Sequence, residues 1–385
     1  MACSDVCFAL VGSVPHNSRA LRQLRALAQL GLSIEAFGVG PPVALPADLQ
    51  SSVRYHSLPL PEGQGPRFFW QLHRQFLRVL RSCQARIYHA GDLYVLPALA
   101  RTARRFGGRL VFDARERYPY VASTAGRPLR QRFWKLVERH YIRQADLVLT
   151  VSEGIAVHLV HDYGIASPLV LYNAPEAPAP TVQTTSLRQH LQLPDHLVLF
   201  LYQGHLRPGR GCLLPLEALP EVPEAALVYL GDGPLAPVIR ERATTLGVAD
   251  RVHLLPPVLP DKLLPVTASA DVGLVLLEDT CLNHRLALPN KLFEYLAAGL
   301  PVLASNLPEL RRVVETYGVG YVVDTPNLEA LTAAMRQLCG DPALRRRLAA
   351  RTSAAFAAHS WARLAPRFQE AYQKLLCDVQ PTCAG

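Results

Sequence analysis

The sequence predicts an α/β protein of two doubly wound, Rossmann-like domains. Three observations support this. The chain has 385 residues, of which 50% are hydrophobic, and this is more than one hydrophobic core usually covers. Short apolar runs alternate with segments of helical periodicity in both halves. A segment rich in proline and small polar residues, 174–186, interrupts the alternation and is interpreted as an interdomain linker.

In the first half, seven runs rich in Val, Ile, Leu and Phe are predicted strands: 6–12, 34–40, 53–58, 85–90, 109–114, 147–152 and 169–174. Between them, 18–31 carries leucines at helical spacing, and 69–84 and 127–145 are predicted basic helices. Strands that alternate with helices indicate a mostly parallel sheet covered on both faces.

The alternation restarts after the linker. The predicted strands are 197–204, 225–233, 252–258, 272–279, 301–305 and 320–324, and the predicted helices include 291–299, 327–340 and a helical tail from 341. We therefore expect an N-terminal domain at 1–175, a linker at 176–190, a C-terminal domain at 191–365, and a final helix at 366–385 that packs toward the N-terminal domain. A cleft between the carboxyl ends of the two sheets is the expected ligand site.

Composition narrows the class of protein. No apolar stretch reaches about 18 residues, and the start of the chain lacks a basic leader, so it is interpreted as a first strand rather than a signal peptide. The eight cysteines are scattered without CxxC spacing, which disfavours a zinc site or a disulfide framework and fits a reducing cytoplasm. No metal site is predicted.

The net charge of +9 arises in the first half. Residues 1–175 contain 21 Lys and Arg against 11 Asp and Glu, whereas 176–385 contain 19 against 20. Such a field attracts anionic partners, namely nucleic acid, a membrane surface or a phosphorylated substrate. The alternative is an arginine-rich surface that simply faces water.

One carboxylate, Glu294, stands in an otherwise apolar helical run. Pro289 disfavours helix before it and Asn290 is a good N-cap, so the helix should begin near Lys291, with Glu294 roughly 5–6 Å inside. A helix N-terminus suits phosphate, and a carboxylate one turn deeper suits the two hydroxyl groups of ribose. The alternative is a carboxylate stabilised only by the helix dipole.

A second candidate is the loop after the strand at 197–204. It contains Gly204, Gly209 and Gly211 together with Arg207 and Arg210. Glycine lets a backbone approach a ligand closely, and arginine binds phosphate oxygens in bidentate fashion. The alternative is an ordinary turn.

Residues 288–314 and 202–235 resemble the nucleotide-sugar-binding domain of family 4 glycosyltransferases, retaining enzymes of the GT-B fold. In the first half, 89–99, 109–119 and 145–165 are similar to the family in position and order. The resemblance covers nearly the whole chain, and its most specific part is the block around Glu294.

For the donor, the resemblance implies that Glu294 binds the ribose hydroxyls and that Arg210 neutralises the diphosphate. It also implies that the backbone at Asn290, Lys291 and Leu292 approaches the phosphate and sugar.

For the acceptor domain, the resemblance implies that Gly12 lies in the loop after the first strand, near the reaction centre. It places His89, Asp92 and Glu116 in two strand-end loops that face the cleft.

The sequence departs from the family pattern at several positions. Leu286, eight positions before Glu294, replaces the first of two glutamates that have seven residues between them in many relatives. Gly204 is followed by His205 where Gly-Arg is common, so Arg207 is expected to compensate. Gly91 and Arg115 stand where relatives have histidines, which bears on acid-base chemistry.

The expected reaction is retaining transfer from a nucleoside diphosphate sugar, with no other cofactor. The leaving diphosphate can accept the proton of the acceptor while Arg207, Arg210 and the helix N-terminus stabilise its charge. No carboxylate pair suggests a two-acid hydrolase, no Asp-x-Asp pair suggests a metal, and no GxGxxG follows the first strand. A sugar-nucleotide epimerase or phosphorylase-like enzyme and a non-catalytic subunit remain alternatives.

The expected acceptor is a glycan, a lipid-linked molecule or a small molecule, and nucleic acid is not expected. The predicted helix at 127–145 interleaves basic and aromatic side chains, which suits peripheral docking on the inner face of an anionic cytoplasmic membrane. The alternative is that the aromatic residues belong to the core and the arginines face water. The residues concerned are Arg127, Arg130, Arg132, Phe133, Trp134, Lys135, Arg139, Tyr141 and Arg143.

Overall fold

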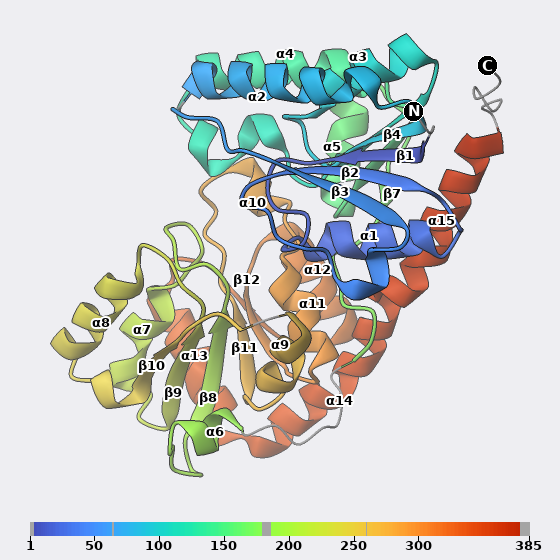
Figure 1. Cartoon of the computed structure of the whole chain (residues 1–385). Coiled ribbons are helices and arrows are strands. Elements are labelled where there is room, and N and C mark those ends of the chain that lie inside the picture. Colours follow the sequence, from blue (N-terminus) through green and yellow to red (C-terminus); the bar gives the residue numbers. More distant parts are fainter. Residues whose placement is uncertain (1–3, 64, 179–185, 259, 378–385) are drawn as a thin grey trace. The chain divides into compact units, whose positions relative to one another are not determined.

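The computed structural model describes residues 4–63, 65–178, 186–258 and 260–377, and it divides into two compact units (Figure 1). Unit 1 comprises Met1–Leu171 and Leu364–Gly385, and unit 2 comprises Tyr172–Arg363. Much of the predicted linker, 179–185, and the end of the predicted final helix, 378–385, lie outside the described residues.

Unit 1 contains a seven-stranded parallel sheet in the order β3-β2-β1-β4-β5-β6-β7. Its strands are β1 (Ser4–Ala9), β2 (Ile34–Val39), β3 (Val53–Leu58), β4 (Ala85–Ala90), β5 (Arg109–Ala114), β6 (Leu147–Thr150) and β7 (Leu169–Val170). The chain moves outward from β1 to β3 and then crosses back to β4. This reversal beside β1 is the feature that places ligand sites in doubly wound folds.

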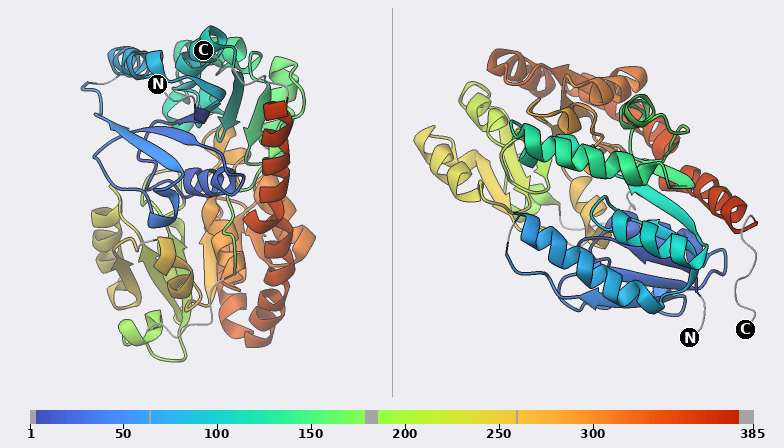
Figure 2. Two further views of the ribbon diagram at one scale, coloured as in Figure 1. Left: turned by 45° about the vertical axis from the view of Figure 1, so that its right-hand side comes forward. Right: turned by 90° about the horizontal axis from the view of Figure 1, so that it is seen from above.

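Helices cover both faces of this sheet. In Figures 1 and 2, α2, α3 and α4 form a layer on one face, and α1 and α15 lie on the other. The C-terminal helix α15 is tied to unit 1 by Gln369, whose amide donates to the carbonyl of Ala26 at 2.8 Å, and by Arg86, which donates to the carbonyl of Leu376 at 2.8 Å. The helices are α1 (Ser18–Ala28), α2 (Gly65–Val79), α3 (Leu96–Phe106), α4 (Pro128–Ile142), α5 (Glu153–Tyr163) and α15 (Trp361–Cys377).

Unit 2 contains a six-stranded parallel sheet in the order β10-β9-β8-β11-β12-β13. Its strands are β8 (Val198–Gln203), β9 (Ala225–Leu230), β10 (Val252–Leu255), β11 (Val272–Val275), β12 (Val302–Ser305) and β13 (Gly320–Val323). Its helices are α6 (Leu187–His190), α7 (Leu214–Ala218), α8 (Ala236–Thr245), α9 (Pro260–Thr267), α10 (Leu282–Arg285), α11 (Asn290–Ala297), α12 (Pro308–Tyr317), α13 (Leu328–Gly340) and α14 (Pro342–His359).

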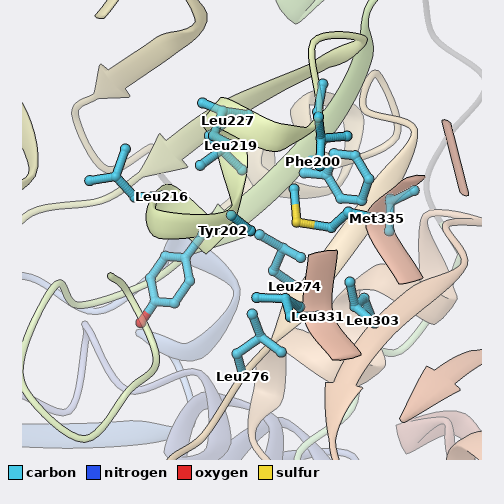
Figure 3. Close-up of a cluster of buried hydrophobic side chains, with 14 of the residues drawn as sticks. Phe200, Tyr202, Leu216, Leu219, Leu227, Leu274, Leu276, Leu303, Leu331 and Met335 are labelled. Carbon is cyan, nitrogen blue, oxygen red and sulfur yellow. The ribbon is translucent and has the colours of Figure 1, made fainter. Parts of the chain in front are cut away.

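The strands β8 and β9 are buried along their whole length, because helices cover the sheet on both faces. Phe200 of β8 and Leu227 of β9 pack with Leu216 of α7 and Met335 of α13 in the core of unit 2 (Figure 3). This apolar core fixes the positions of the polar loops that follow the strands.

Local sequence signals account for several helix ends. The side chains of Asn17, Ser152 and Asn327 accept hydrogen bonds from the first turns of α1, α5 and α13. Gly164 and Gly318 end α5 and α12 in the left-handed conformation.

The predicted class, two parallel-sheet Rossmann-like domains with a helical C-terminal region, is confirmed, and a strand is found in every segment where one was predicted. Helices α3, α5, α8 and α12 were not predicted as such. In the part of the chain that the structure describes, no helix combines the length and the apolar character that a membrane span requires.

Candidate functional site

Most predicted site residues lie where the strand order of a sheet reverses. In unit 1, β1 and β4 are neighbours, and the loops after them contain Gly12 and Asp92. In unit 2, β8 and β11 are neighbours, and the loop after β8 contains Gly204 and the two arginines. Carboxyl ends of strands at such a reversal are the usual ligand position in open α/β sheets.

Glu294 is held in a defined orientation by neighbouring side chains. One carboxylate oxygen accepts a hydrogen bond from the side-chain amide of Gln203, the last residue of β8. The other end of that amide, Oε1, accepts from the hydroxyl of Thr267 at 2.9 Å. Glu294 is only partly buried, so the network orients the carboxylate without enclosing it.

The neighbouring residue, Tyr295, fixes the helix against the sheet. Its hydroxyl accepts from the backbone N–H of Gln203 at 3.0 Å and donates to the carbonyl of Leu201 at 2.9 Å. Gly273 of β11 makes room for the ring, because a Cβ there would lie 2.3 Å from it. Since Tyr295 is fully buried, it sets the register of α11 and therefore the position of Glu294.

Lys291 brings a cation to the same end of α11. Its ammonium lies 3.4 Å from the centre of the Tyr202 ring, a cation–π contact. Burial, together with the charge of Arg210, lowers the pKa of Lys291 to about 7, although Cys212 and Glu294 act to raise it. Lys291 and Arg210 therefore form a closely spaced pair of cations that an anion would stabilise.

The glycine-rich loop has a backbone that only glycine tolerates at key points. Gly209 and Gly211 have φ angles of 80° and 66°, and a Cβ on Gly211 would lie 1.5 Å from the carbonyl oxygen of Leu276. Glu278 fastens the loop, since its N–H donates to the carbonyl of Gly209 at 3.2 Å and its carboxylate accepts from the N–H of Gly211 at 3.3 Å.

The tip of this loop is exposed. Gly204, with a φ of 118°, His205 and Arg207 all face solvent, and Arg210 is half-buried. A Cβ on Gly204 would lie 3.9 Å from Cε of Lys291. The structure thus brings Gly204 and Lys291 together and leaves Arg207 exposed.

One prediction for the start of α11 is wrong. Asn290 is not the N-cap: Pro289 holds that position in extended conformation, and the side-chain oxygen of Asn290 instead accepts from the amide of Asn173 at 2.6 Å. Leu292 is fully buried, and its N–H donates to the carbonyl of Pro289 at 3.0 Å. The amides of Asn290 and Lys291 precede any intrahelical acceptor, as is usual for the first N–H groups of a helix.

In unit 1, Asp92 organises the loop that contains Gly12. Its carboxylate is buried and accepts hydrogen bonds from the N–H groups of Val11 at 2.6 Å, Tyr94 at 2.9 Å and Val95 at 3.1 Å. Burial raises the pKa of Asp92, although Arg115 and these N–H groups act to lower it. This carboxylate therefore positions the backbone of both loops.

The two positions that lack histidines differ in packing. Gly91 donates its N–H to the carbonyl of Ala9 at 2.7 Å, and a Cβ there would lie 2.9 Å from Cβ of Leu10. Arg115 is partly exposed, with its guanidinium 3.8 Å from the carboxylate of Asp92. A larger residue at 91 would require the loop after β1 to shift.

The prediction that His89 lies in a strand-end loop is wrong. His89 belongs to β4 and is fully buried, with its Nδ1 hydrogen-bonded to the hydroxyl of Tyr372 on α15. Burial lowers its pKa to about 3, so the ring is neutral. Glu116 does follow β5, and it is partly exposed.

Sequence reasoning missed Gln203 and Thr267, which hold Glu294 in place. Gln203 carried a signal, because a polar residue ends an apolar strand immediately before the glycine-rich loop. Thr267 carried none, because its role depends on a contact 64 residues away in sequence. Within the described residues, no group of three or more His, Cys, Asp or Glu side chains could hold a metal ion.

Two family models match the chain. Residues 198–341 match the model described as "Glycosyl transferases group 1", and residues 16–175 match the "Glycosyl transferase 4-like domain". Together the two models cover most of the chain, with one match in each unit.

A named glycosyltransferase is similar to the chain in sequence, and two solved structures share its fold. The D-inositol 3-phosphate glycosyltransferase of Xylanimonas cellulosilytica is 32% identical over 249 residues, which are 61% of this chain and 58% of that protein. The chain thus spans less than two thirds of the length of that relative. Sucrose-phosphate synthase from Thermosynechococcus elongatus has the same fold, with a TM-score of 0.79 and 18% identity over 97% of this chain and all of that one. Anabaena HepE in complex with UDP-glucose also has this fold, with a TM-score of 0.73 and 16% identity over 96% of this chain and 99% of that one.

Proposed function

Because the chain belongs to family 4 of the glycosyltransferases and has their GT-B fold, we propose that it transfers a sugar from a nucleoside diphosphate sugar to an acceptor, with retention of anomeric configuration. The donor binds to unit 2 in this proposal. Glycosyltransfer in the named relative and UDP-glucose in the complex with the similar fold support it.

The orientation of Glu294 carries the proposal. A partly exposed carboxylate, held by Gln203 one turn inside α11, can accept hydrogen bonds from both ribose hydroxyls of the donor. Lys291, Arg210 and the first amides of α11 lie toward the N-terminus of the same helix, where a diphosphate would find positive charge.

The same cations are proposed to drive the reaction. As the bond to the sugar breaks, negative charge grows on the diphosphate, and Arg207, Arg210 and Lys291 stabilise it. A phosphate oxygen on the same face of the sugar takes the proton from the acceptor hydroxyl, so the configuration is retained. The protein's own cations supply the charge stabilisation, and we propose no cofactor beyond the donor.

Acceptor binding is assigned to unit 1. Gly12, Arg115 and Glu116 lie at the carboxyl ends of β1 and β5, and Asp92 fixes the first of these loops. His89 is proposed to act only through packing, because its ring is enclosed and neutral. The excess of positive charge in this half favours an acceptor with an anionic group, whether a glycan, a lipid-linked molecule or a small molecule.

A panel of nucleoside diphosphate sugars tests the proposal. Thermal shift should identify a stabilising donor, and an acceptor-independent hydrolysis assay should show slow release of its sugar. Glu294→Ala should lower the affinity for that donor by about 10- to 100-fold, because hydrogen bonds to a charged group are lost. Glu315→Ala, which removes an exposed carboxylate from α12, is the matched control. Unchanged donor affinity in Glu294→Ala would refute the ribose assignment.

A non-catalytic nucleotide-binding subunit is the second candidate. The tight packing at Gly91 and the pairing of Arg115 with Asp92 favour it, because both positions lack a histidine that could hold the sugar or move a proton. Donor binding without hydrolysis or transfer, across the full panel and with added acceptors, would select this alternative.

A further inference from the structure

One face of α4 exposes apolar side chains. Trp134, Glu138 and Ile142 point into unit 1 and are buried. On the opposite side of the helix, Leu129 is 83% exposed, Phe133 56% and Leu136 58%. Their spacing of four and three residues places the three side chains in one stripe along the helix.

Cations flank this stripe, and α4 itself has no exposed carboxylate. Arg130, Arg132 and Arg139 are exposed on α4. The only acidic residue of α4, Glu138, is fully buried and accepts from Arg117 at 2.8 Å and from the hydroxyl of Tyr163 at 2.6 Å. The outward face of α4 is therefore apolar at its centre and positive at its edges.

The neighbouring helix α2 has the same character. It contains no Asp or Glu, and its exposed Trp70 is stacked under the guanidinium of Arg74, 4.7 Å from the ring centre. Phe69 of α2 meets Trp134 of α4 with ring centres 4.8 Å apart, so the two helices touch at this point, and α3 packs against both. Of the aromatic residues of α4, Trp134 therefore belongs to the core and Phe133 lies on the surface.

We propose that this basic–apolar face, formed by Leu129, Phe133, Leu136 and the flanking arginines of α4 with Trp70 and Arg74 of α2, docks on an anionic lipid bilayer. Leucine and phenylalanine enter the boundary between head groups and acyl chains, while arginine remains at the phosphate level. The proposal goes beyond sugar transfer and does not depend on it.

Two other occupants fit this face less well. A second copy of the chain would bring the same positive charge against itself. A nucleic acid would satisfy the arginines but would leave the exposed leucines without an apolar partner. A bilayer with anionic head groups satisfies both features at once.

Vesicle sedimentation of the full chain tests the proposal. Vesicles of phosphatidylcholine with phosphatidylglycerol should sediment the protein, and vesicles of phosphatidylcholine alone should not. Phe133→Ser combined with Leu136→Ser should weaken the partition coefficient more than tenfold. Arg132→Gln combined with Arg139→Gln should lower the partition coefficient about fivefold for each charge removed and should make vesicle binding depend less on salt. Thermal unfolding verifies that these surface variants remain folded.

Matched controls come from the other unit. Val238→Ser and Arg240→Gln alter an exposed apolar residue and an exposed cation of α8 and should leave vesicle binding unchanged. The proposal is overturned if the wild-type chain does not sediment with anionic vesicles, or if the α4 variants bind as well as the α8 controls. Concentration-dependent dimerisation that the Leu136 change abolishes, without vesicle binding, would assign the face to a second copy instead.

Discussion

The carboxylate of Glu294 accepts a hydrogen bond from the side-chain amide of Gln203, which joins the second turn of α11 to the end of β8. The amide is itself oriented by the hydroxyl of Thr267. A chain of three side chains from three different elements therefore determines where the carboxylate points, and each member can be removed separately.

Gln203→Ala should weaken binding of the preferred nucleoside diphosphate about 5- to 10-fold. The carboxylate remains, but it loses the partner that orients it, so the loss is smaller than for Glu294→Ala. Thr267→Val should have a smaller effect in the same direction. Calorimetric titration measures both, with Gln337→Ala on the exposed face of α13 as control. Affinity equal to wild type in Gln203→Ala would show that Glu294 needs no orientation.

Lys291 predicts a pH dependence of donor binding. Because its pKa in the free protein is about 7, the side chain of Lys291 is largely a neutral amine above that pH. A bound diphosphate favours the charged form and raises the pKa, so binding takes up a proton. Affinity should be constant below about pH 7 and should fall up to about tenfold per pH unit above it, until the pKa of the bound state is reached.

Lys291→Arg provides the test, because arginine keeps its charge over this range. Titrations of the nucleoside diphosphate from about pH 6 to pH 9 should show a sloping profile for the wild type and a flatter one for the variant. Parallel profiles for the two proteins would remove Lys291 from diphosphate binding.

The fold could be predicted because its determinants are local in sequence. Buried parallel strands such as β8 and β9 are short apolar runs, and Gly299 marks the end of the helix predicted at 291–299. The role of His89 could not be predicted, although the apolar run at 85–90 already places it in a strand, because the partner of its ring lies on the distant helix α15. Its partner, Tyr372, lies 283 residues away.

The site was partly predictable for a related reason. Glu294 stands out as a charge in an apolar helix, and the glycine-rich loop is visible in the sequence. Asn290 matched a good N-cap, but the extended conformation of Pro289 takes that position and shifts the helix start by one residue. Which carboxylates face a ligand and which hold backbone, as Asp92 does, depends on long-range contacts.

From the packing around Gly91 we predict that the histidine of relatives cannot simply be introduced at this position. Gly91→Ala should lower the free energy of unfolding by about 1–3 kcal/mol, because its Cβ would press on Cβ of Leu10. Gly91→His should be destabilised further and should gain no activity. Gly340→Ala, at the end of α13 with no atom within 4 Å of the added Cβ, should be neutral or stabilising by up to about 1 kcal/mol. Urea unfolding measures all three, and an unchanged Gly91→Ala midpoint would contradict the packing argument.

His89 predicts that the protein loses stability as the pH falls below about 6.5. Its pKa is 6.5 in an unfolded chain and about 3 in the folded one, because burial disfavours the charged ring and Arg19 and Arg115 oppose it, although Asp113 acts in the other direction. Between these values the unfolded chain binds a proton that the folded chain does not, so each pH unit removes up to about 1.4 kcal/mol.

Urea unfolding at about pH 7.5 and pH 5 isolates this contribution. The wild type should lose about 2 kcal/mol more than His89→Gln between the two conditions, since glutamine does not titrate. Gln at 89 also lowers stability at both pH values through lost packing on Phe8, so the difference between the pH values is the diagnostic quantity. His16→Gln removes an exposed histidine and is the matched control. An identical pH dependence in the wild type and in His89→Gln would mean that the ring is not kept neutral by its burial between β4 and α15.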